Sequence, residues 1–134
     1  MTDQNLITEF LALPRYAVVG VSADRKKYGY KIWRSLREKG YTVYPINPRY
    51  DDIEGERCYR SLAEVADRVD VVDLVVPPKV TEEIVTECAD LGLTRVWMQP
   101  GAESEEAIRF CHENGISVLH DVCVMAESLP RLER

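Results

Sequence analysis

The chain has 134 residues, of which 46% are hydrophobic and 30% charged, and it carries a net charge of −6 at pH 7. This length suits one domain with an enclosed core, so we expect a single domain over residues 1–134. An acidic chain repels DNA and anionic lipid, which argues against nucleic acid and membranes as partners. The amino-terminal residues lack a leader pattern, and no apolar run approaches the roughly 20 residues of a membrane span. We therefore expect a cytoplasmic protein with reduced thiols.

Helices and strands are predicted to alternate along the chain. A leading helix over residues 2–13 would turn Leu6, Ile7, Phe10 and Leu13 inward. Short apolar runs that are rich in valine and bounded by glycine or proline are typical of buried strands. Five such runs occur, at residues 16–20, 41–46, 71–76, 95–98 and 116–119.

The helices expected between these strands are marked by apolar stripes and by end signals. Stripes within residues 32–36, 80–91 and 107–111 predict three of them. Residues 61–64 match a capping box and predict a short further helix, and residues 125–134 predict a last helical turn with a frayed end. Pro78 and Ser104 suit helix starts. Glycine ends a helix directly before a strand at three places, Gly40, Gly92 and Gly115.

This alternation implies an α/β fold with a five-stranded parallel sheet and helices on both of its faces. In such sheets, ligands bind beyond the carboxyl ends of the strands, where the strand order reverses. The loops that would carry function are therefore residues 20–29, 47–52, 76–79, 99–104 and 121–125.

The first of these loops has small residues at the positions that a dinucleotide-binding turn requires, although it lacks the usual glycine pattern. Gly20 ends a strand and permits a tight turn, and the hydroxyl of Ser22 could face a phosphate. Gly29, without a side chain, lets helix, strand and ligand approach one another. The start of the following helix favours an anion.

Basic residues gather at the same predicted edge of an otherwise acidic chain. Arg25, Lys26 and Lys27 are consecutive in the first loop, while Arg49 and Lys79 follow the second and third strands. A run of charges is often only a solvated surface, but this placement favours a ligand that carries several phosphates.

The end of the second strand discriminates between such ligands. An NAD site expects a carboxylate there to hold the ribose 2′-hydroxyl. The chain instead has Asn47, Pro48 and Arg49, and Asp51 and Asp52 come later. An arginine suits an extra ribose phosphate, which NADP carries at the 2′ position and coenzyme A (CoA) at the 3′ position.

The loops after the third and fourth strands contain residues that could contact other parts of a nucleotide ligand. Val76, Pro77 and Pro78 form a rigid corner that could wall an adenine or a pantetheine arm, because proline fixes the backbone and removes N–H donors. In the loop after the fourth strand, Gln99 could bond a polar ligand group and Gly101 permits close approach. Trp97 is expected in the core.

The four cysteines, Cys58, Cys88, Cys111 and Cys123, form no C-x-x-C pair, so no metal site is expected. Cys88 and Cys111 are expected to be core residues, and His112 to lie on the surface. His120 and Cys123 are close in sequence and raise the question of a thiol nucleophile. No oxyanion motif accompanies them, and on a continued strand they would point to opposite faces. We therefore expect no catalytic residue.

Five stretches in register resemble the stand-alone CoA-binding proteins, which are similar to the N-terminal domain of the succinyl-CoA ligase α subunit. The stretches are residues 20–23, 40–48, 76–78, 97–101 and 121–123. The resemblance implies a single Rossmann-like domain that holds CoA. In the ligases the histidine that becomes phosphorylated lies on a second domain, so succinyl-CoA synthesis is not expected here.

The resemblance also implies roles for individual loops. The loop of Gly20, Val21, Ser22 and Ala23 would hold the pyrophosphate. The turn of Asn47, Pro48 and Arg49 would lie near the 3′-phosphorylated ribose. Val76, Pro77 and Pro78 would border the adenine and the start of the pantetheine arm. The arm would run along Gln99, Pro100 and Gly101 towards the thiol.

Together, these observations predict a protein that binds CoA or an acyl-CoA without catalytic machinery, with Lys27 and Gly29 added to the binding residues named above. Three alternatives remain open at this point. They are an NADP-dependent oxidoreductase or nucleotide sensor, a redox protein in which Cys123 forms a mixed disulfide with CoA, and a scaffold whose nucleotide site is vestigial. No Tyr-x-x-x-Lys arrangement supports the first of them. The sequence leaves protein partners and oligomeric state open.

Overall fold

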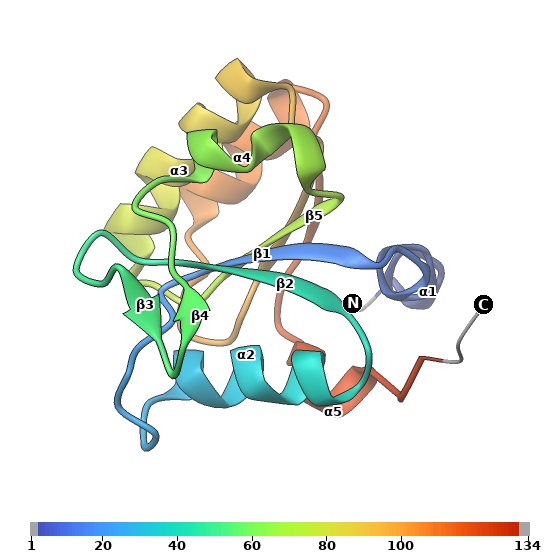
Figure 1. Cartoon of the computed structure of the whole chain (residues 1–134). Coiled ribbons are helices and arrows are strands. Elements are labelled where there is room, and N and C mark those ends of the chain that lie inside the picture. The colour runs from blue at the N-terminus through green and yellow to red at the C-terminus, as the bar shows by residue number, and fades with distance from the viewer. Residues whose placement is uncertain (1–2, 132–134) are drawn as a thin grey trace.

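The computed structural model describes residues 3–131 (Figure 1). The first helix, α1 (Gln4–Ala12), begins after Asp3, whose carboxylate accepts a hydrogen bond from the backbone N–H of Leu6 at 3.1 Å. Residue 2, where the sequence predicted that this helix begins, and residues 132–134, part of the predicted frayed end, lie outside the described residues.

Five parallel strands form the central sheet, in the order β2-β1-β5-β6-β7. They are β1 (Arg15–Val19), β2 (Thr42–Ile46), β5 (Val71–Leu74), β6 (Arg95–Met98) and β7 (Ser117–Leu119). The strand order reverses between β1 and β5, because the chain leaves β1 towards β2 on one side and returns to β5 on the other. The predicted five-stranded parallel sheet is confirmed.

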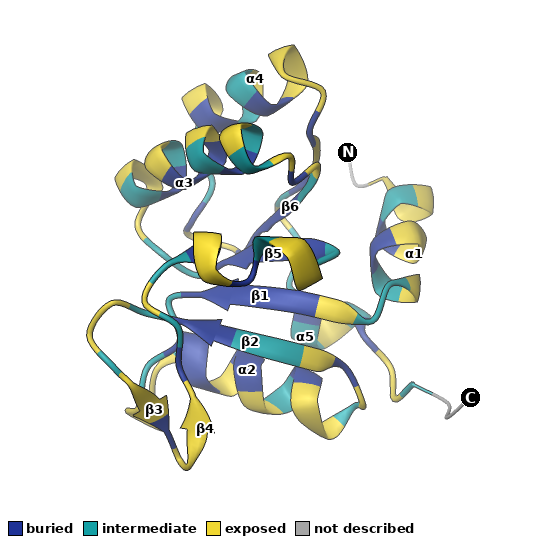
Figure 2. Ribbon diagram, turned by 45° about the horizontal axis from the view of Figure 1, so that its top comes forward, coloured by how far each residue is buried: buried dark blue, intermediate teal, exposed yellow. Residues whose placement is uncertain are grey.

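Helices cover both faces of this sheet, as predicted. In Figure 1, α3 (Pro78–Leu91) and α4 (Glu105–Glu113) lie on one side, and α2 (Tyr28–Glu38) and α5 (Val124–Glu127) on the other. Each face encloses its own core: Ile84, Cys88 and Cys111 belong to one, and Trp33 and Trp97 to the other. Figure 2 shows buried stripes on the inner sides of α2, α3 and α4 and exposed residues on their outer sides.

The helix signals read from the sequence operate as expected in α3 and α4. Pro78 is the first residue of α3, and Gly92 ends that helix in the left-handed conformation with φ of +75°. The hydroxyl of Ser104 accepts a hydrogen bond from the backbone N–H of Ala107 and so caps α4. None of the helices within residues 3–131 combines the length and apolar composition that a bilayer crossing requires.

The segment between β2 and β5 differs from the prediction. It contains a two-stranded antiparallel hairpin of β3 (Asp52–Ile53) and β4 (Glu56–Arg57) that the sequence analysis did not anticipate. The predicted second helix is replaced by two 3-10 turns, η1 (Leu62–Glu64) and η2 (Ala66–Arg68). The side chain of Ser61 makes no capping bond, and the Glu64 carboxylate instead accepts one from the N–H of Arg60.

Candidate functional site

A cavity of about 780 Å³ opens at the carboxyl ends of β2, β1 and β5. It therefore lies where the strand order reverses, which is the place that the general rule for parallel sheets assigns to a ligand. Nine of the residues predicted from the sequence line it: Gly20, Ser22, Lys27, Gly29, Asn47, Pro48, Arg49, Val76 and Pro77.

Two glycines bring the end of β1 and the start of α2 together. Gly20 has φ of +103°, and a Cβ atom on it would overlap the carbonyl oxygen of Val75. A Cβ atom on Gly29 would overlap the carbonyl oxygen of Gly20. The turn after β1 and the start of α2 therefore lie close together, and Lys27, Tyr28 and Gly29 line the cavity. Helix amino ends attract anions.

Asn47 ties the loop after β2 to the loop after β1. Its side-chain amide donates to the backbone oxygen of Val21 at 2.8 Å, and its side-chain oxygen accepts from the N–H of Arg49 at 2.9 Å. The backbone N–H of Asn47 donates to the carbonyl oxygen of Tyr59. Because the bond to Val21 joins two loops that are 26 residues apart and the bond to Arg49 closes the turn, the turn that carries Arg49 is fixed against the predicted phosphate loop.

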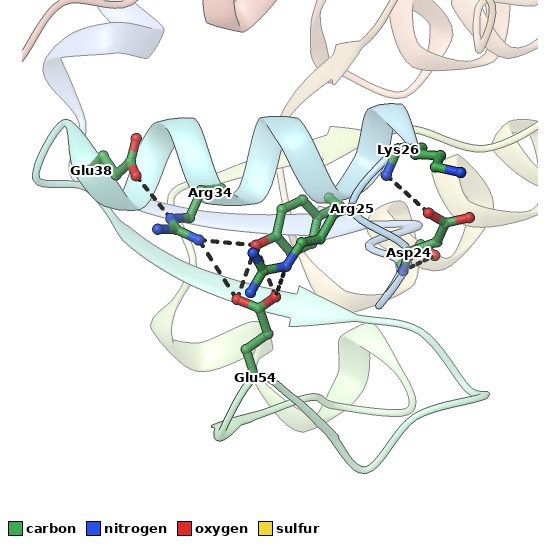
Figure 3. A network of polar contacts seen from close by, with 8 residues as sticks. Asp24, Arg25, Lys26, Arg34, Glu38 and Glu54 are labelled. Atoms are coloured by element: carbon green, nitrogen blue, oxygen red, sulfur yellow. Dashed lines mark hydrogen bonds and ion pairs between the residues drawn. The ribbon is translucent and has the colours of Figure 1, made fainter.

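Within the basic run of residues 25–27, Arg25 and Lys27 have different surroundings. Figure 3 shows the guanidinium of Arg25 turned to Glu54 on the β3–β4 hairpin, at 2.7 Å, in a network that includes Arg34. Lys27 instead lines the cavity. Burial opposes ionisation of Glu54, but hydrogen bonds from Tyr30 and Arg25 outweigh it and lower the pKa of that carboxyl.

Two cations of the cavity wall have no acidic partner. Lys27 and Arg49 form no ion pair with any residue in the described range 3–131. Lys79, the other basic residue predicted at this edge, is outside the wall and lies 3.8 Å from Glu82. The positive charge available to a ligand therefore comes from the loops after β1 and β2.

The remaining predicted site residues lie elsewhere. Val21 is buried, and Ala23 and Pro78 are exposed outside the cavity wall. Pro100 and Gly101 line a neighbouring hollow of about 240 Å³ that shares Val76 and Pro77 with the main cavity. This hollow extends the site towards β6.

Gln99 has a role inside the protein. Its side chain is fully buried, its amide nitrogen donates to Asp73, and its oxygen accepts from the N–H of Val124 at 3.0 Å. Both ends of the amide are thereby used to join β5 and β6 to α5. The structure gives no support to the predicted contact between this side chain and a ligand.

His120 and Cys123 do not contact each other. The imidazole of His120 lies 2.6 Å from the carboxylate of Asp121, and the hydroxyl of Tyr28 donates to the sulfur of Cys123 at 2.6 Å. Strand β7 ends at Leu119, so the alternation argument for these side chains does not apply. Cys88 and Cys111 are buried as predicted, and burial raises the pKa of their thiols to about 12 and about 11.

Sequence reasoning missed several cavity residues. Arg60, Ser61 and Leu62 come from the segment after the unanticipated hairpin, and Ile84 and Glu87 from the face of α3. The spacing of Val80, Ile84 and Glu87, four and three residues apart, places them on one side of a helix and was the available signal.

Residues 14–128 match a family model described as "CoA binding domain". The chain belongs to this family. The resemblance read from the sequence is thereby confirmed, and so is the assignment of the chain as a CoA-binding, Rossmann-like domain.

Relatives of this CoA-binding domain include both short and long proteins. It is 31% identical to the α subunit of the ADP-forming acetate–CoA ligase II of Pyrococcus furiosus over 119 residues, which is 81% of this chain and 26% of that protein. It is 27% identical to YneT of Bacillus subtilis, with 82% of each chain covered. The chain therefore spans about a quarter of that ligase subunit and most of YneT.

Solved structures of similar size share the fold closely. A conserved hypothetical protein of Pyrococcus furiosus has a TM-score of 0.84 at 44% identity, covering 87% of this chain and 100% of that one. A hypothetical protein of Pyrococcus horikoshii has a TM-score of 0.87 at 35% identity, covering 95% and 89%.

Proposed function

We propose that this protein binds CoA, free or acylated, and performs no reaction on it. The observation that carries the proposal is the pair of cations, Lys27 and Arg49, which form no ion pair among the described residues and lie on two loops that meet at one cavity. CoA carries a pyrophosphate and a separate 3′-phosphate, and two separate cationic positions suit these two groups. The membership in a CoA-binding family supports the same ligand.

In this proposal, each part of the ligand has a complementary wall. The pyrophosphate lies against the turn of Gly20 and the amino end of α2, near Lys27. The 3′-phosphate lies against Arg49. The pantetheine arm passes Val76 and Pro77 towards the hollow lined by Pro100 and Gly101, which are apolar or free of side chains.

The proposed absence of chemistry is supported by how the reactive side chains are engaged. His120 is occupied by Asp121, and Cys123 by Tyr28. Burial, and then the bond to Cys123, raise the pKa of the Tyr28 hydroxyl, so Tyr28 remains a neutral hydrogen-bond donor at physiological pH. We expect no turnover when the protein is incubated with acyl-CoA esters.

The first experiment is a thermal-shift comparison of CoA, dephospho-CoA, NAD and NADPH at equal concentration. A ligand at 100 times its Kd adds about 2.7 kcal/mol of stability, which is roughly 10 °C for a chain of this length. We expect CoA to shift the melt most, dephospho-CoA less, and NAD not at all. A larger shift with NADPH than with CoA would favour the oxidoreductase alternative instead.

Arg49→Ala is expected to weaken CoA binding about tenfold or more while leaving dephospho-CoA binding unchanged. The expected size follows from the loss of a hydrogen bond between charged groups, about 1.5–3 kcal/mol. Isothermal titration with both ligands measures it. Arg109→Ala, on the exposed side of α4, is the matched control. Equal losses for the two ligands would place the 3′-phosphate elsewhere.

A further inference from the structure

Glu87 is a carboxylate in the cavity wall without a partner. It lies on α3 one turn beyond Ile84, is half-buried, and forms no hydrogen bond or ion pair with any side chain within residues 3–131. Glu82, another acidic residue of this helix, contacts Lys79 and Ser104 and does not line the cavity. Glu87 is therefore the acidic group that the cavity offers to a ligand.

The cavity wall that contains Glu87 also contains several apolar residues. Ile46, Leu62 and Ile84 line the cavity and are all at least nine-tenths buried. Arg60 also lines the cavity, but its guanidinium is bonded to Asp51 at 2.8 Å. A flat, uncharged ring would pack well against these apolar residues. It would also remove water from Glu87, so it must supply a hydrogen-bond donor in exchange.

The proposed positions of the phosphates determine where the base of the nucleotide lies. If the pyrophosphate lies at Gly20 and Lys27 and the ribose phosphate at Arg49, the base on the same ribose extends past Arg49 into the remaining wall. That wall includes the segment around Leu62 and the face of α3. The base is thereby placed on α3 and not at residues 76–78, where the resemblance put it. The inference rests in this respect on the proposed function.

We propose that Glu87 reads the base of the nucleotide by accepting a hydrogen bond from the 6-amino group of adenine. A carboxylate only accepts hydrogen bonds. Adenine presents an N–H donor at position 6. Hypoxanthine and guanine present a carbonyl oxygen there, which repels a carboxylate that faces position 6, and their nearest donor is the N1–H one ring atom away. A site built to pair with a donor discriminates strongly against an analogue that lacks it. Glu87 is then a specificity-determining residue.

The test compares adenosine 3′,5′-bisphosphate with inosine 3′,5′-bisphosphate, two probes that carry the same phosphates and differ at position 6 and in the proton on the adjacent N1. Isothermal titration of the wild-type protein is expected to show at least a tenfold preference for the adenosine compound. In Glu87→Gln the preference is expected to fall to about twofold or less, because the amide of glutamine can rotate and donate to the carbonyl of hypoxanthine. Glu83→Gln, on the exposed side of the same helix, should keep the wild-type preference.

The outcomes separate this inference from the proposed function. If the wild-type protein binds CoA and both bisphosphates equally well, the assignment of Glu87 is wrong and CoA binding stands. If Glu87→Gln keeps the full preference, the assignment is also wrong. If the wild-type protein binds neither CoA nor the bisphosphates, the proposed function itself fails. Should Glu87→Gln not fold, a wild-type protein that binds both bisphosphates equally well would still overturn the assignment.

Discussion

Gly29→Ala is expected to lower the melting temperature by roughly 4–8 °C and to abolish stabilisation by CoA. The added methyl group would overlap the carbonyl oxygen of Gly20, which is held in the turn at the end of β1. Overpacking of this kind costs about 1–3 kcal/mol, and about 4 °C is lost per kcal/mol in a chain of this size. Either α2 or the turn must move, and both border the cavity.

The sign of this effect is informative because helix propensity acts in the opposite direction. Alanine is better than glycine inside a helix by about 1 kcal/mol, so a loss of stability reports the close approach of the two backbones. Ser35→Ala, in the same helix, is the control and should leave the melting temperature unchanged or slightly raised. A Gly29→Ala protein as stable as the wild type would mean that α2 can shift outward without cost.

Asp73→Asn is expected to raise stability by roughly 3–5 kcal/mol at pH 7.5, since a difference of one pKa unit between the folded and unfolded states is worth about 1.4 kcal/mol, and to have little effect near pH 4. Asp73 is fully buried in β5, and burial raises the pKa of its carboxyl to about 8, although the bond from Gln99 opposes this shift. In the unfolded chain, the pKa is about 3.9. Between these values the folded protein holds a proton that the unfolded chain has released, so stability falls as pH rises from about 4 towards 8.

Urea unfolding at several pH values between 4 and 8 measures this effect. Asparagine can still accept the bond from Gln99 but cannot ionise, so the difference between variant and wild type should widen as pH rises. Asp70→Asn is the control of opposite sign. Hydrogen bonds from Arg15 outweigh burial and lower the pKa of Asp70, so its replacement should destabilise the protein at neutral pH and matter less in acid. Parallel curves for wild type and Asp73→Asn would contradict the prediction.

The central sheet and its helices could be predicted because their signals are local. Valine-rich runs between glycine and proline identify strands that are buried on both faces, and Ser104 and Gly92 act through neighbouring backbone groups. The β3–β4 hairpin has a much weaker signal. Ile53 is its one buried residue, and the turn depends on Glu54 adopting φ of +51° before Gly55, which is a rare conformation for glutamate.

The candidate site could be predicted only where it coincides with the strand ends. Gly20, Asn47 and Val76 follow strands, so the topology brings them to one edge. Glu87 lies three turns into α3, and its place in the cavity depends on how the helix packs over the sheet. Gln99 also follows a strand, but the buried carboxyl of Asp73 needs a partner inside the protein, and that need determines where the amide points.

The described ends of the chain have a consequence for how this fold can be joined to other proteins. The N–H of Arg131 donates to the carbonyl oxygen of Lys39, and its guanidinium to that of Leu11, so the tail is fastened beside the amino ends of β1 and β2. Figure 1 shows α1 and this tail on the side away from the β3–β4 hairpin. A polypeptide attached at either end would leave from the pole opposite the cavity. Such an arrangement lets one nucleotide-binding unit serve in chains of very different length without rebuilding its ligand-facing edge.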